Sequence, residues 1–187
     1  MSHIVNQILG ELTSLAQRIN PEELDAMATL LYDTHKNGGR IFLAGAGRSG
    51  CVVKAFTNRL MHCGLTVYLL GDITTPPIKE GDILFALSGS GMTTQLINYA
   101  NKSISCGAKV ATITLQKEGT IGKMASAMVV LPGTTRFNDD TGTVSIQPIG
   151  NCFEQLAWLT CDGIVILLKE KLGLTNEDLI HHHANLE

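Results

Sequence analysis

Phe85-Ala86-Leu87-Ser88-Gly89-Ser90-Gly91-Met92-Thr93-Thr94 carries more information about this chain than any other ten residues. An apolar run breaks here into alternating serine and glycine, and then into a segment that can begin a helix. Small residues let backbone N–H groups turn inward together, and the hydroxyl groups add further donors. Such an uncharged, donor-rich pocket at a helix N-terminus suits a phosphate dianion. The same residues also suit a flexible turn between a strand and a helix, so other parts of the chain must distinguish the two.

The segments on both sides of this turn alternate between helical and strand patterns. Continuous apolar runs predict strands at 40–44, 66–70, 82–87, 109–115 and 127–131. Helical patterns cover 4–19, 21–36, 49–63, the stretch from the turn to about 105, 119–124 and 149–171, with a short last helix capped by Thr175. Uninterrupted apolar strands are typical of a parallel sheet covered on both faces. We therefore predict a single domain over 1–187 of the α/β class: a doubly wound, five-stranded parallel sheet flanked by helices, with two N-terminal helices.

A second small-residue loop, Gly45-Ala46-Gly47-Arg48-Ser49-Gly50, follows the first predicted strand. Because both loops directly follow strands of a parallel sheet, they reach the same edge. Ligands of doubly wound sheets bind at that edge, beyond the carboxyl ends of the strands, so the two loops together favour a phosphate site. The loop also matches part of the dinucleotide fingerprint G-x-G-x-x-G. The acidic residue expected after the second strand is missing, however, because 68–71 reads Tyr-Leu-Leu-Gly and Asp72 comes late. Neither loop is followed by the G-K-[ST] of a P-loop NTPase.

Composition narrows the classes of function. The net charge is −3 and Lys and Arg form no cluster, which argues against a nucleic-acid groove. The most apolar run, 164–168, is far shorter than the roughly 20 residues of a membrane span, and the first residues lack signal-peptide features. Five cysteines without a C-x-x-C pair are typical of small buried side chains in a reducing compartment. We expect a cytoplasmic protein with no metal site, no nucleic-acid partner and no membrane contact.

The pairing of G-x-G-R-S-G after one strand with S-G-S-G-x-T after another resembles the sugar isomerase (SIS) domain family, and within it the 6-phospho-3-hexuloisomerases. Other matching pieces run to the end of the chain. They are Arg59-Leu60-Met61-His62, Thr75-Pro76-Pro77, Gln147-Pro148-Ile149-Gly150, Phe153-Glu154-Gln155 and His183-Ala184-Asn185-Leu186-Glu187. Met92 departs from the pattern, since family members often carry Glu there. The resemblance implies a flavodoxin- or Rossmann-like SIS fold and a homotetramer with sites near the subunit interfaces.

By this resemblance, the reaction interconverts D-arabino-3-hexulose 6-phosphate and D-fructose 6-phosphate. It moves a carbonyl between C3 and C2 through an enediol, and one base that removes and returns the proton requires no metal or redox cofactor. We expect Glu154 to be that base. It is the only acid between Asp140 and Asp162, and it lies among apolar residues near the start of the long helix after the polar loop 132–148. A surface carboxylate on an amphipathic helix is the alternative.

His183, in the terminal motif, is expected as a second acid/base or as a contact for sugar hydroxyls. It could act in its own site or in that of a neighbouring subunit, and a histidine that caps the last helix is the alternative. His62 is predicted as a helix C-terminal histidine. Arg59 is as consistent with a structural ion pair as with substrate contact.

The predicted phosphate and substrate contacts are small residues or hydrogen-bond donors in the two loops. They are Gly47, Arg48, Ser49, Ser88, Gly89, Ser90, Gly91 and Thr93. A surface salt bridge is the alternative for Arg48. Two other functions of the same domain remain open: an aldose–ketose phosphate isomerase acting between C1 and C2, and a non-catalytic sugar-phosphate sensor. No helix-turn-helix or basic segment supports the sensor.

Overall fold

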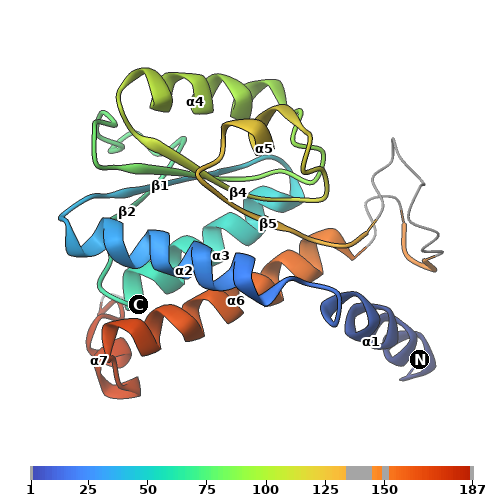
Figure 1. Ribbon diagram of the computed structural model, residues 1–187. Coiled ribbons are helices and arrows are strands. Elements are labelled where there is room, and N and C mark those ends of the chain that lie inside the picture. The colour runs from blue at the N-terminus through green and yellow to red at the C-terminus, as the bar shows by residue number, and fades with distance from the viewer. Residues whose placement is uncertain (1, 134–144, 149–151, 186–187) are drawn as a thin grey trace.

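A computed structural model describes residues 2–133, 145–148 and 152–185. The strands are β1 (Ile41–Gly45), β2 (Val67–Leu69), β3 (Ile83–Leu87), β4 (Lys109–Thr114) and β5 (Ala127–Val130). The helices are α1 (Ser2–Ala16), α2 (Pro21–Lys36), α3 (Arg48–His62), α4 (Thr94–Ser105), α5 (Thr120–Met124), α6 (Phe153–Leu172) and α7 (Asn176–His181). The strands form one parallel sheet in the order β2-β1-β3-β4-β5, which confirms the predicted fold class (Figure 1).

The order of the strands reverses between β1 and β3. From β1 the chain moves outward to β2, returns to β3 on the other side of β1, and continues to β4 and β5. Gly45 pairs with Leu87, so the loops after β1 and β3 leave the sheet at the same level. These loops therefore flank the crevice where ligands bind in doubly wound sheets.

Helices cover both faces of this sheet (Figure 1). The helices α2, α3 and α6 lie on one face, and α4 and α5 lie on the other. Successive side chains of a strand point to opposite faces. Ile41 and Leu43 accordingly join the core that contains residues of α2, α3 and α6, whereas Phe42 and Ala44 join the core that contains residues of α4 and α5. Burial on both faces explains why the strands have continuous apolar runs.

Several element boundaries differ from the predicted ones. The first helix ends at Ala16 and not at 19, because the backbone turns there and Asn20 becomes the N-cap of α2. The Asn20 side chain accepts a hydrogen bond from the backbone N–H of Glu22 at 2.9 Å. The predicted start of the long helix at 149 and most of the predicted loop 132–148 lie outside the described residues. Thr175 caps α7 through a reciprocal hydrogen-bond pair with Asp178, as predicted.

The apolar run at 164–168 forms part of α6. Ile164, Val165 and Leu168 are buried, whereas Ile166 is 59% exposed. Ile164, Val165 and Leu168 therefore lie on the core-facing side of α6, and Ile166 lies on its solvent-facing side. Within the described ranges, no helix has both the length and the apolar character that crossing a membrane requires.

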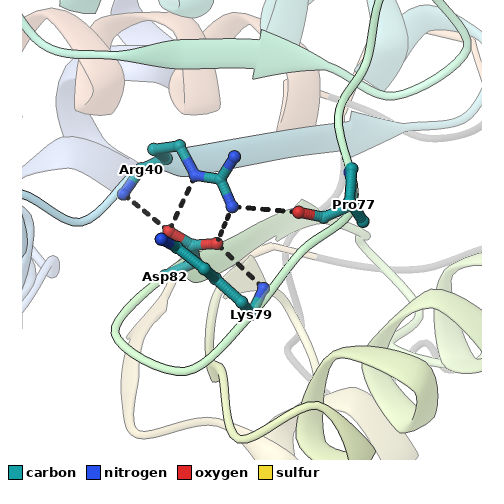
Figure 2. Close-up of polar contacts among 4 residues, drawn as sticks. All are labelled: Arg40, Pro77, Lys79 and Asp82. Carbon is teal, nitrogen blue, oxygen red and sulfur yellow. Dashed lines mark hydrogen bonds and ion pairs between the residues drawn. The ribbon is translucent and has the colours of Figure 1, made fainter.

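A buried ion pair fixes the amino edge of the sheet (Figure 2). Asp82 is 1% exposed and accepts hydrogen bonds from the backbone N–H and guanidinium of Arg40 and from the backbone N–H of Lys79. Arg40 also donates to the carbonyl oxygen of Pro77 at 2.9 Å. Burial alone would raise the pKa of Asp82, but the hydrogen bonds outweigh it and hold this pKa below its ordinary value. The pair ties the segment that precedes β3 to the residue immediately before β1.

Candidate active site at the carboxyl edge of the sheet

The Ser/Gly turn after β3 is held by its own hydrogen bonds. The Ser88 hydroxyl is 3.2 Å from the Thr93 hydroxyl, and it accepts from the backbone N–H of Gly91 at 3.2 Å. The Ser90 hydroxyl accepts from the backbone N–H of Met92, also at 3.2 Å. A hydroxyl that accepts one hydrogen bond still has its own O–H to donate. The turn therefore presents hydroxyl donors from a fixed backbone.

Neighbouring elements anchor the same turn. The carbonyl oxygen of Gly89 accepts from the backbone N–H of Leu115 at 3.0 Å and from the Thr114 hydroxyl at 3.3 Å, which ties the turn to the end of β4. A Cβ atom at Gly89 would lie only 3.3 Å from the ring of Phe153. The first residue of α6 thus packs directly against the turn. These contacts hold the Ser/Gly turn against the end of β4 and the start of α6.

The Ser/Gly turn at 88–93 and the first turn of α4 together present hydrogen-bond donors in an arrangement that we call the phosphate cradle. Thr93 is the N-cap residue of α4, but its side chain makes no capping hydrogen bond and instead lies beside the Ser88 hydroxyl. The first backbone N–H groups of a helix have no partners within the helix and carry a partial positive charge. Together with the serine hydroxyls they form an arrangement that can bind a phosphate group.

The loop after β1 brings the end of its strand very close to the start of α3. A Cβ atom at Gly45 would lie 2.9 Å from backbone atoms of Ser49, and a Cβ atom at Gly50 would lie 2.9 Å from the carbonyl oxygen of Gly45. Gly47, the N-cap of α3, has a φ of 56°, which favours glycine. The glycines therefore allow this close approach, and they place Arg48 and Ser49 in the first turn of α3, beside the crevice.

Glu154 lies in the first turn of α6, one residue after the Phe153 ring that contacts the Ser/Gly turn. Its side chain is 21% exposed, and its Oε2 atom lies 3.4 Å from Nε of Arg48. Glu154 is thus partly buried between the two loops and is not a fully exposed surface carboxylate. Arg48 is 75% exposed and forms the ion pair that the sequence left open, but its partner is the predicted base.

His183 lies elsewhere, near the C-terminal end of α3. Its ring stacks on that of His62 with centroids 3.9 Å apart, and His182 contacts the carbonyl oxygen of His62 at 3.0 Å. A helix rises 1.5 Å per residue, so the two ends of α3, Arg48 and His62, lie about 20 Å apart. Within one chain, His183 and Glu154 therefore do not share a cavity.

The two histidines border a pocket of about 320 Å³ between α3 and α6. Its polar lining residues are Asn58, Arg59, His62, Asp162 and His183. The half-exposed indole of Trp158 and the buried thiol of Cys161 complete the wall on the α6 side. Burial raises the pKa of Cys161, so this sulfur stays a neutral thiol.

The structure thus brings together most of the residues that the sequence singled out. Gly47, Arg48, Ser49, the turn at 88–93 and Glu154 converge on the carboxyl edge, while His183 joins His62 and Arg59 at the other end of α3. Sequence reasoning missed Asn58, Trp158 and Asp162 as pocket residues. The only sequence signal for these pocket residues is their spacing of one helical turn: Asn58 lies one turn before His62 on α3, and Trp158 lies one turn before Asp162 on α6. Within the described ranges, no three His, Cys, Asp or Glu side chains gather as a metal site would require.

Comparison with known proteins adds a family. Residues 35–139 match the SIS domain. The chain is 42% identical over 183 residues to the 3-hexulose-6-phosphate isomerase of Bacillus subtilis, covering 98% of this chain and 97% of that protein. It is 35% identical over 180 residues to the 3-hexulose-6-phosphate isomerase of Mycobacterium gastri, covering 96% and 88%.

Solved structures agree with these sequence matches. The chain superimposes with a TM-score of 0.80 on a Methanococcus jannaschii protein whose crystal structure was taken to infer a molecular function of 3-hexulose-6-phosphate isomerase. That match is 26% identical and covers 98% of each chain. The similarity therefore extends over all the elements that carry the two loops, Glu154 and the terminal helix.

Proposed function

The chain belongs to the SIS domain family, and we propose that it is an isomerase that interconverts D-arabino-3-hexulose 6-phosphate and D-fructose 6-phosphate. The observation that carries this proposal is the packing of Phe153 against Gly89 of the Ser/Gly turn, which brings the first turn of α6, with Glu154, to the carboxyl edge. A phosphate cradle beside a partly buried carboxylate provides one group that holds the substrate and one that can move its proton. Full-length relatives named as 3-hexulose-6-phosphate isomerases support the choice of sugar.

In this proposal the phosphate of the sugar lies in the cradle. The hydroxyls of Ser49, Ser88, Ser90 and Thr93 and the backbone N–H of Gly89 donate to it, and the hydrogen bond between Ser88 and Thr93 opens so that both of these hydroxyls can do so. The N–H of Gly91 already donates to Ser88, so its contribution would require that hydrogen bond to be shared. Arg48, which is mostly exposed and contacts Glu154, is placed to contact the anion or the sugar oxygens.

Glu154 is the proposed base. Its carboxylate removes the proton from C2 of the 3-ketose, the electrons of that C–H bond form the C2=C3 double bond, and the C3 carbonyl oxygen takes up a proton. Return of the carbon-bound proton to C3, with loss of the proton on the C2 oxygen, gives the 2-ketose. One base serves both carbons, and the overall reaction consumes no oxidant or reductant.

His183 is proposed to act as the second acid/base in the site of a neighbouring subunit. Within one chain it lies at the opposite end of α3 from Glu154, so the two can share a site only across an interface. Large apolar side chains are exposed on α1 and α6, which supports burial between subunits. They are Ile4, Val5, Leu9, Trp158, Leu159 and Ile166. A homotetramer in light scattering is expected, and a monomeric mass would contradict the shared site.

A direct assay tests the function. The protein is mixed with D-fructose 6-phosphate, and formation of the 3-hexulose 6-phosphate is followed, with and without EDTA. We expect equal turnover in both, because no step of the proposed mechanism uses a metal. Formation of an aldose 6-phosphate from D-fructose 6-phosphate, without the 3-hexulose 6-phosphate, would favour an aldose–ketose isomerase. Tight binding of sugar phosphate without turnover would favour a sensor.

A further inference from the structure

The carboxylate of Glu11, on α1, accepts hydrogen bonds from residues that precede α6. Among the described residues, four donors converge on it, from 145–147 and Cys152. They are the Ser145 hydroxyl at 2.7 Å, the backbone N–H of Ile146 at 3.0 Å, the side-chain amide of Gln147 at 3.3 Å and the thiol of Cys152 at 3.4 Å. Glu11 thus connects α1 to the residues immediately before the helix that carries Glu154.

The charge states of the cluster match these hydrogen bonds. The backbone hydrogen bond from Ile146 lowers the pKa of Glu11; burial opposes this, and the side-chain donors reinforce it. Burial and the neighbouring Glu11 raise the pKa of Cys152 to about 11. At neutral pH the Glu11 carboxylate is therefore ionised and can accept, and the Cys152 thiol keeps its proton and can donate to it.

The backbone at Cys152 shows that the entry to α6 is constrained. Cys152 is the N-cap of α6 and has a φ of 24°, in the region that residues other than glycine rarely adopt. Such a conformation persists only where its surroundings fix it. The thiol is held by Glu11 and by the amide of Gln147, while the Cys152 carbonyl accepts from the backbone N–H of Leu156 at 2.7 Å. Glu154 follows two residues later.

We propose that Glu11 is a positioning residue for the base: by holding residues 145–147 and the N-cap residue Cys152 it sets the direction in which α6 begins and so the place of the Glu154 carboxylate. This inference rests on the proposed function of Glu154. The described residues that donate to Glu11 are Ser145, Ile146, Gln147 and Cys152, while the phosphate cradle is held by its own hydrogen bonds, by β4 and by the packing of Phe153 against Gly89. Because the hydrogen bonds of the cradle do not involve Glu11, its main effect is on the proton-transfer step, and its effect on phosphate binding, through the packing of Phe153, is small.

The test is Glu11→Gln, which keeps the shape of the side chain but provides one acceptor oxygen in place of two. We expect kcat to fall about tenfold to a hundredfold, since a displacement of about 1 Å in a catalytic group has effects of that order, while KM stays within about twofold. Glu23→Gln is the matched control. Glu23 is also a helix carboxylate that accepts a backbone N–H, from Val130 at 2.7 Å, but it is not on the approach to α6.

Two further variants separate positioning from a structural role. In the background of Glu154→Gln, adding Glu11→Gln should cause no further loss of turnover, because the base on which it acts is gone. Ser145→Ala removes one of these four donors to Glu11 and should lower kcat about threefold to tenfold. If Glu11→Gln does not fold, Ser145→Ala tests the positioning role in its place.

The outcomes are distinguishable. Wild-type kcat in a folded Glu11→Gln, a rise in KM without a fall in kcat, or an additive loss in the double variant would overturn the positioning role. If Glu11→Gln fails to fold, unchanged kcat in Ser145→Ala would overturn it. Lack of isomerase turnover in the wild-type protein, or full turnover in Glu154→Gln, would overturn the proposed function itself.

Discussion

The two edges of the sheet both carry polar and charged side chains, but these groups are used differently. At the amino edge, Asp82 is buried and receives hydrogen bonds from Arg40 and Lys79. At the carboxyl edge, the Ser90 hydroxyl accepts a hydrogen bond from the backbone and keeps its O–H group available to a ligand, and one O–H of the hydrogen-bonded pair Ser88 and Thr93 also stays available. Charge near a strand end is thus not by itself a sign of a site. What distinguishes the carboxyl edge is that the fold holds hydroxyl hydrogen-bond donors in place and leaves some of them free to bind a ligand.

The largest effect that would test this contrast is loss of the base. Glu154→Gln removes the proton acceptor and keeps the size of the side chain, so turnover should fall about ten-thousandfold, while a titration should show sugar-phosphate binding of similar strength. Glu118→Gln is the control. Glu118 is another acid paired with a cation, Lys123 at 3.8 Å, and it is 80% exposed. Undiminished turnover in Glu154→Gln would remove Glu154 as the base.

The next effect concerns the pocket at the C-terminal end of α3, where His183 stacks on His62. Because α3 leads from the carboxyl end of β1 back to the start of β2, this pocket lies toward the amino edge of the sheet. His183→Asn should lower kcat about a hundredfold, and His181→Asn, in the same tail, should not. Mixing denatured and refolded subunits of His183→Asn and Glu154→Gln should restore activity that neither variant has alone, because some interfaces would combine both native residues. Absence of any recovery in correctly assembled mixed oligomers would contradict a site shared between subunits.

The carboxyl edge was predictable because its signals are local. A strand buried on both faces needs a continuous apolar run, and a helix that begins directly after it needs glycines such as Gly45 and Gly50 at the point of close approach. Both requirements are visible within ten residues of sequence. The same local logic identified Thr175 as the cap of α7.

The amino-edge pocket and the Glu11 cluster were not predictable in this way. His62 stacks on His183, which lies 121 residues later in the chain, and Glu11 accepts a hydrogen bond from Ser145, which lies 134 residues later. No local pattern marks a residue whose partner is supplied by the packing of α1, α3, α6 and α7. His183 could be singled out only by resemblance, and its position next to His62 follows from the way the tail folds back on the end of α3.

A smaller effect is expected when one hydroxyl is removed from the cradle. Ser88→Ala takes away one donor to the phosphate while the other hydroxyls and the N–H groups remain. A hydrogen bond to a charged group contributes about 1.5–3 kcal/mol, so KM should rise at least about tenfold with little change in kcat. Ser105→Ala, at the exposed end of α4, is the control and should change neither constant. An unchanged KM in Ser88→Ala would argue against phosphate binding at this turn.

The smallest effect on turnover is expected from Asp82, the buried charge at the amino edge. Asp82→Asn leaves the Arg40 guanidinium without its counter-charge, which should lower the free energy of unfolding by about 3 kcal/mol while kcat and KM stay as in the wild type. Because hydrogen bonds hold the pKa of Asp82 below its ordinary value of 3.8, its stabilising contribution is complete above that pH and is lost as the pH falls through the folded-state value. The difference in stability between wild type and Asp82→Asn should therefore shrink in acid, as measured by urea unfolding at a series of pH values. Glu80→Gln, an exposed neighbour, should show no such difference, and a loss of kcat in Asp82→Asn would mean that the amino edge contributes to the chemistry as well as to the frame.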